Sequence, residues 1–185
     1  MDVTKRPGGS KLRSMKNCDW TRQLKPLYQR ALQRYQDGDR DWQTWFDATE
    51  TADLASIGAT PMELFDYAED ASSLDWETAL LITAVRRDYF LVMQHGVHSS
   101  NRVNMEELPA KTVALDGIPW LPRIIQKAQG RLRGELPNEL MYCCSGDRAF
   151  LKEHDLHPAD FLREIWAAGR DEKRILAYVK SGGKF

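Results

Sequence analysis

Apolar residues recur at steps of three and four along most of this chain, which is the pattern of amphipathic helices. The first such run covers residues 20–35 and ends before Gly38. A second run covers residues 42–57, with a break expected near Thr49. Strictly alternating apolar and polar positions, which are typical of strands, are scarce. The pattern therefore predicts an all-α protein.

Two helix starts in the first half carry recognisable capping signals. Thr60 is followed by Pro61, which suits the first helical position, and by Glu63, which can complete a capping box with the Thr60 side chain. Further along, Asp75 or Ser73 begins a long apolar helix. We expect both helices to begin at these residues.

The helical pattern is lost between residues 96 and 119, where polar residues, two prolines and two glycines interrupt it. We interpret this segment as a connector between two helical units. The predicted organisation is an N-terminal extension over residues 1–19, one unit over 20–95, the connector over 96–119 and a second unit over 120–185.

The second unit repeats the order of elements in the first. A helix from Pro122 to Gly134 is followed by shorter helices over 147–154, 158–168 and 172–179. An offset of 97 residues aligns the two units without a gap, although few residues are identical. The shared order predicts a divergent internal duplication.

Charge and composition exclude few functions. The chain has 26 basic and 27 acidic residues, so its net charge of -1 creates no overall field that would attract nucleic acid or an anionic membrane. No run approaches the roughly 18 apolar residues that span a bilayer, and the N-terminus lacks an apolar leader segment. We therefore expect a cytoplasmic protein with no membrane partner, no cofactor and reduced cysteines.

A set of positions in the C-terminal third combines a helix start, a glycine after that helix, a tyrosine–cysteine segment and an acid–arginine pair. These positions are Leu121, Pro122, Arg123, Gly134, Tyr142, Cys144, Asp147 and Arg148. In these features the chain over 115–179 resembles the bacterial family catalogued as domain of unknown function 5069. The resemblance implies a small soluble bacterial protein, and it implies no particular activity.

Groups able to do chemistry concentrate between residues 139 and 161. The candidate functional patch consists of Cys144, Asp147, Arg148 and His154. Cys144 precedes a short predicted helix, and the positive end of that helix together with Arg148 would favour a reactive thiolate. A general base would have to come from His154, near the far end of the same helix, or from a distant histidine.

Two other interpretations compete with a reactive thiol. Zinc would need Cys143 and Cys144 with His154 and His157, but adjacent cysteine side chains point in different directions, so we expect no metal site. The structural interpretation, which we favour, makes both cysteines small buried residues and Asp147 a helix cap, with Ser145 as the competing cap. It also pairs Arg148 with Glu153 or Glu139, and it makes His157 a helix-boundary residue.

Arg123, Lys127 and Arg131 form a basic face on one predicted helix. Such faces are usually solvated, although they can contact phosphates. The six tryptophans are expected in the core because of their helical spacing.

The sequence favours a non-enzymatic binding or regulatory protein with a protein or small-molecule partner. One alternative is a thiol-dependent enzyme or redox sensor that uses Cys144. A second is a nucleic-acid-associated factor that uses the basic helix over residues 123–131.

Overall fold

The computed structural model describes residues 15–184. Its elements in chain order are α1 (Trp20–Gln36), the 3₁₀-helix η1 (Trp42–Thr44), α2 (Ala48–Ser56), α3 (Pro61–Glu69), α4 (Trp76–Val92), the 3₁₀-helix η2 (Met105–Glu107), β1 (Ala114–Leu115), β2 (Ile118–Pro119), α5 (Leu121–Arg133), α6 (Ser145–Glu153), α7 (Pro158–Ala168) and α8 (Glu172–Lys180). The fold class predicted from the sequence, all-α, is confirmed. Most of the N-terminal extension predicted over 1–19 lies outside the described residues.

The helices of the first half begin where side chains cap them. The Thr60 hydroxyl accepts from the Glu63 amide and the Glu63 carboxylate accepts from the Thr60 amide, which confirms the predicted capping box. Asp75, and not Ser73, caps α4 by accepting from the amide of Thr78. Both helices therefore start at locally defined positions.

The second apolar run is divided earlier than the sequence suggested. The break separates η1 from α2, and Thr49 lies inside α2. Asp47 and Glu50 form a second capping box, with Asp47 accepting from the Glu50 amide at 2.8 Å. Because this box starts a new helix at Ala48, the break expected near Thr49 was misplaced by a few residues.

The elements of the second half correspond to those of the first. Helices α2 and α6 each span nine residues and begin 97 residues apart, and α3 and α7 also begin 97 residues apart. At matching positions between these helices, Gly58 has φ 72° and Asp155 has φ 55°, so both turns use the left-handed conformation. The internal duplication stays a prediction, which this correspondence supports.

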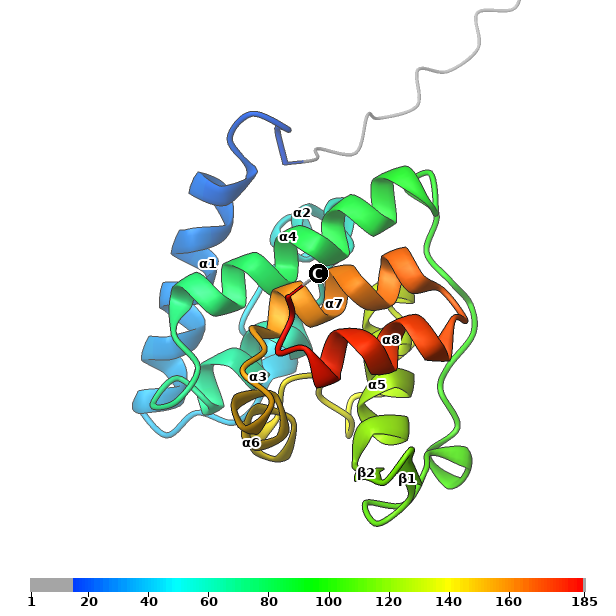
Figure 1. The fold of residues 1–185 in the computed structure, drawn as a ribbon. Coiled ribbons are helices and arrows are strands. Elements are labelled where there is room, and N and C mark those ends of the chain that lie inside the picture. Colours follow the sequence, from blue (N-terminus) through cyan, green and yellow to red (C-terminus); the bar gives the residue numbers. More distant parts are fainter. Residues whose placement is uncertain (1–14, 185) are drawn as a thin grey trace, which may run out of the picture.

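Both predicted units contribute to one hydrophobic core. Helix α4 packs against α5 and α7, and α1 packs against α3. Figure 1 shows α8 folding back alongside α7, so that α7 lies between α4 and α8 and packs against both. Trp45 is fully buried, whereas the other five tryptophans are partly buried and pack against the core.

The connector runs down one side of the molecule from the end of α4 to the hairpin β1–β2, as Figure 1 shows. The amide of Val103 donates to the carbonyl of Glu135 at 2.8 Å, and Leu108 is buried, so the connector is attached to the helical body. The hairpin ends directly before Trp120, the residue that precedes α5. Within residues 15–184, none of the helices has the length and apolar character needed to cross a membrane.

Candidate functional site

A buried ion pair joins α5 to α6. The Lys127 ammonium lies 2.5 Å from the Asp147 carboxylate, and the two side chains are 2% and 0% exposed. An isolated charge in such a place would be strongly destabilising, so each group depends on the other. This pair is the centre of the candidate site.

Three donors converge on the Asp147 carboxylate. Besides Lys127, the indole N–H of Trp120 donates at 3.0 Å and the amide of Cys143 donates at 2.9 Å. The prediction that Asp147 caps α6 is wrong, because the N-cap is Cys144 and Asp147 is the third helical residue. Asp147 instead points inward, where the cation on α5 compensates its charge.

Cys144 shares the Lys127 ammonium with Asp147. The Nζ atom of Lys127 lies 3.1 Å from the sulfur of Cys144, which is partly exposed. As the N-cap of α6, Cys144 also lies at the positive end of a nine-residue helix, and its side chain caps no helical amide. The sulfur is therefore next to a fixed ammonium group and accessible from outside.

Backbone strain is concentrated around the same carboxylate. Trp120 has φ 67° and Cys143 has φ 71°, a left-handed conformation that bulky residues rarely adopt. Both residues donate hydrogen bonds to Asp147. The Trp120 ring also lies so close to Gly146 that a Cβ there would be only 2.5 Å from a ring carbon. Strain of this kind often accompanies functional sites.

Arg148 connects the segment before α6 to α3. Its guanidinium donates to both carboxylate oxygens of Asp70 at 2.7 and 3.1 Å, to the Ser73 hydroxyl and to the carbonyl of Cys143. The pairing expected with Glu153 or Glu139 is therefore wrong. The true partner is the C-cap of α3, at a sequence distance that local spacing could not reveal.

The two histidines of this segment lie away from the sulfur. His154 is the C-cap of α6, at the opposite end from Cys144, and its ring packs 4.6 Å from that of Phe150. The structure thus brings Cys144, Asp147 and Arg148 together but does not bring His154 to them. His157 is the N-cap of α7 and accepts from the amide of Ala159, which confirms the predicted boundary role. Over residues 15–184, no three His, Cys, Asp or Glu side chains are grouped so that they could hold a metal ion.

Cys144 opens into a groove with a volume of about 610 Å³, which is lined by residues of α3, the connector, α5 and the segment before α6. We call it the Cys144 groove. Asp66 lines it from α3 and makes no ion pair or side-chain hydrogen bond within the described part of the chain. Burial raises the pKa of Asp66 to about 7, with smaller contributions from the nearby carboxylates of Glu69 and Asp70. This carboxyl group can therefore exchange a proton near neutral pH.

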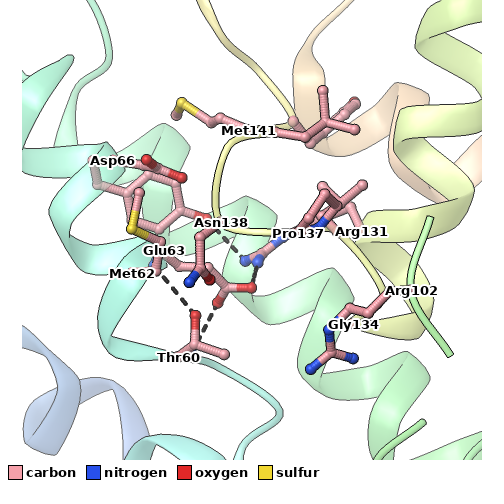
Figure 2. Close-up of a pocket in the computed structure, with 14 residues that line it drawn as sticks. Thr60, Met62, Glu63, Asp66, Arg102, Arg131, Gly134, Pro137, Asn138 and Met141 are labelled. Atoms are coloured by element: carbon pink, nitrogen blue, oxygen red, sulfur yellow. Dashed lines mark hydrogen bonds and ion pairs between the residues drawn. The ribbon is translucent and has the colours of Figure 1, made fainter. Parts of the chain in front are cut away.

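A smaller cavity of about 90 Å³ adjoins this groove through Asp66 and is shown in Figure 2. Arg131 lies against it, pairs with Glu63 and donates to the Tyr67 hydroxyl at 3.0 Å. The hydroxyl of Tyr67 in turn donates to Thr83, whose own hydrogen is donated to a backbone carbonyl. Burial lowers the pKa of Arg131 to about 10. The cavity wall is thus held by a continuous chain of hydrogen bonds.

The predicted basic face on α5 is not a solvent-exposed face in the structure. Lys127 and Arg131 are 1% and 4% exposed, because their partners on α6 and α3 draw them into the protein. Arg123 alone of the three is partly exposed, and it donates to the carbonyl of Pro109. The face is not solvated, and it offers no row of free cations to phosphates.

No family model matches the chain, and no curated protein or solved structure matches it significantly. The resemblance of residues 115–179 to the uncharacterised family therefore stays a prediction. The function has to be inferred from the geometry of the site.

Proposed function

We propose that this protein is a regulatory protein that senses oxidants through reversible oxidation of Cys144. The observation that carries the proposal is the 3.1 Å contact between the Cys144 sulfur and the ammonium of buried Lys127. The proposal keeps the non-enzymatic regulatory role favoured by the sequence and adds the thiol that the sequence offered as an alternative.

The environment of Cys144 favours reaction. The thiolate is the reactive form of cysteine, and a neighbouring ammonium group or helix N-terminus stabilises it. Cys144 has both, because Lys127 contacts the sulfur and α6 begins at the next residue. The hydrogen bonds from Trp120 and Cys143 keep Asp147 in place, and Asp147 in turn keeps Lys127 directed at the sulfur.

The other two cysteines provide contrasts within the same chain. Cys143 is fully buried, and burial raises its thiol pKa to about 12, so it should be unreactive in the folded protein. Cys18 is exposed and donates a hydrogen bond to the carboxylate of Asp19 at 3.5 Å. Cys18 therefore serves as an exposed thiol whose partner is a carboxylate and not an ammonium group.

A route for the signal leads from Cys144 to α3. Cys143 directly precedes Cys144, and its carbonyl accepts a hydrogen bond from Arg148. Arg148 is in turn paired with Asp70 at the end of α3. Oxidation of the sulfur would change its contact with Lys127 and disturb this strained segment. The surface around the end of α3 would then present the altered state to a partner.

Site-resolved alkylation tests the proposal. The folded protein would be treated with iodoacetamide at pH 7, and mass spectrometry would follow each cysteine separately. We expect Cys144 to react about tenfold faster than Cys18 or more, as cationic surroundings predict. Equal or slower reaction of Cys144 than of Cys18 would contradict the proposal.

Variants can assign the effect to Lys127. The double variant Lys127→Met with Asp147→Asn removes both charges, so neither is left buried alone. We expect its Cys144 to react no faster than Cys18, while circular dichroism confirms the helical fold. Lys152→Met is the control, since Lys152 is an exposed cation near the far end of α6 and should leave the rate unchanged.

A further inference from the structure

The Cys144 groove is far larger than a small inorganic oxidant requires. Its volume is about 610 Å³, and apolar side chains form much of its lining. These side chains are Met62, Met105, Trp120, Leu140 and Met141. Met105 is 42% exposed, so this apolar lining is accessible to a molecule in the groove. A reactant that carries an apolar group would bury it here.

The charged lining of the groove does not favour an anion. The acidic residues in it are Asp66, Glu69, Asp70 and Glu139, of which Asp70 is paired with Arg148. Each of the three basic residues also has a contact within the protein. Lys127 pairs with Asp147, Arg123 donates to the carbonyl of Pro109, and Lys111 lies 5.7 Å from the centre of the Trp120 ring. The groove therefore fits an uncharged molecule better than an anionic oxidant.

We propose that the oxidant sensed by Cys144 is an uncharged organic hydroperoxide with an apolar group, and that Asp66 protonates the alkoxide that leaves. This inference rests on the proposed function. It adds the chemical class of the reactant and a second reacting group.

The reaction balances with the groups in the groove. The Cys144 thiolate attacks the outer oxygen of the hydroperoxide, so a sulfur–oxygen bond forms and the oxygen–oxygen bond breaks. The sulfur is oxidised to a sulfenic acid, which keeps the hydrogen of the attacked oxygen, and the peroxide is reduced to an alkoxide. The alkoxide takes a proton from the Asp66 carboxyl group and leaves as an alcohol, after which water returns a proton to Asp66.

Asp66 is better suited than Lys127 to supply this proton. Its carboxyl group lies in the same groove, and within residues 15–184 no hydrogen bond or ion pair engages its side chain. Its pKa of about 7 keeps a large fraction protonated near neutral pH. Loss of a proton from Lys127 would instead leave the fully buried Asp147 carboxylate without its cation.

Competing oxidants test the reactant class. The reduced protein would be exposed at pH 7 to cumene hydroperoxide or to hydrogen peroxide, with dimedone trapping sulfenic acid and mass spectrometry resolving Cys144 and Cys18. The measured quantity is the ratio of the two oxidation rates at each cysteine. Cys18 lies outside the groove, so its ratio reports the intrinsic reactivity of the two peroxides towards a thiol. We expect the ratio of the cumene hydroperoxide rate to the hydrogen peroxide rate to be about tenfold higher at Cys144 than at Cys18.

The outcomes separate the two levels of the proposal. If neither peroxide oxidises Cys144 faster than Cys18, the proposed function fails. If both oxidise Cys144 rapidly and the ratio equals that at Cys18, the sensor stands and the organic reactant is refuted.

Variants test the two parts of the groove. Met105→Ser should lower the rate with cumene hydroperoxide and leave the rate with hydrogen peroxide unchanged. Met93→Ser, at an exposed methionine next to the end of α4, should change neither rate. Asp66→Asn should slow oxidation by cumene hydroperoxide by about tenfold or more, as expected for loss of a general acid, whereas Glu153→Gln, at an exposed carboxylate at the end of α6 that does not line the groove, should not. An unchanged rate in Asp66→Asn would refute its role as proton donor.

Discussion

Glu63 has two structural roles, so its replacement by alanine should be much more destabilising than the loss of a helix cap. One carboxylate oxygen accepts from the amide of Thr60 and completes the capping box at the start of α3. The other pairs with Arg131 on α5, and Figure 2 shows both interactions. The side chain of Arg131 is only 5% exposed. Without Glu63, its charge would remain buried, with the Tyr67 hydroxyl as its hydrogen-bond partner among residues 15–184.

The loss of stability expected for Glu63→Ala is the sum of these two lost interactions. Loss of a helix cap typically lowers the free energy of unfolding by about 1 kcal/mol. Removing one partner of a buried ion pair lowers it by roughly 3–5 kcal/mol, because an uncompensated charge remains. Glu63 is 19% exposed, so water can partly solvate the freed guanidinium, and we place the total near the lower end, at about 4 kcal/mol. That is a large share of the stability of an ordinary domain.

Glu50 supplies a matched control. It occupies the same position in the capping box of Asp47, and it pairs with Arg30 at 2.6 Å. The Arg30 side chain is 39% exposed, so water solvates it when the partner is lost. Glu50→Ala should therefore lower the free energy of unfolding by only about 1–2 kcal/mol.

Urea unfolding followed by circular dichroism would compare the wild type with the Glu63 and Glu50 variants. We expect Glu63→Ala to lose about 2–3 kcal/mol more than Glu50→Ala, as the difference between buried and partly exposed partners requires. Glu63→Gln, which can keep the hydrogen bond to Thr60 but lacks the charge, should lose about 3 kcal/mol, the part assigned to the buried charge of Arg131. Equal losses in Glu63→Ala and Glu50→Ala would refute the reasoning, because the burial of Arg131 would then contribute nothing.

Three further predictions concern stability. Thr60→Ala should lower the free energy of unfolding by about 1 kcal/mol, since it removes one hydrogen bond of the capping box and leaves the pair with Arg131 intact; a loss as large as that of Glu63→Ala in urea would contradict this. His157→Asp should be as stable as the wild type or slightly more stable, because aspartate is the better N-cap, and a marked loss would indicate another role for His157. Burial raises the pKa of Asp66 to about 7, so the folded protein holds a proton that the unfolded chain releases near pH 4. The contribution of Asp66 to the free energy of unfolding should therefore be largest below about pH 4. It should fall as the pH rises towards about 7 and stay low at higher pH. Asp66→Asn should remove this fall and raise the free energy of unfolding by a few kcal/mol at pH 8 relative to the wild type. Urea unfolding between pH 4 and 8 would contradict this if the variant showed the same dependence of stability on pH as the wild type.

The sequence by itself determined the helices of this protein. Helix α7 has the predicted bounds of 158–168, and α3 begins after Thr60 as its capping signals require. Such signals act between residues two or three positions apart, so they operate whatever the rest of the chain does. The same locality explains the one misplaced break, since the box of Asp47 and Glu50 starts α2 before Thr49.

The candidate site was only partly predictable. Cys144, Asp147 and Arg148 were predicted because reactive groups crowd one short segment. Lys127, Trp120 and Asp66 were missed as members of the site, because they come from other elements and no local motif links them to Cys144. The left-handed backbone at Trp120 likewise has no signature in the sequence, and its indole bonds to Asp147, which lies on a different helix.

Only the tertiary structure decided which charges are buried. Lys127 and Arg131 lie one helical turn apart, a spacing that indicates a solvated basic face when no partner is known. In the folded protein Asp147 and Glu63 reach them from α6 and α3 and compensate both charges. A charge can be buried only where packing brings its partner within contact distance, and packing between distant helices is not encoded in the periodicity of either helix. For the same reason the sequence could name Cys144 as a thiol, while only the fold could place an ammonium group beside it.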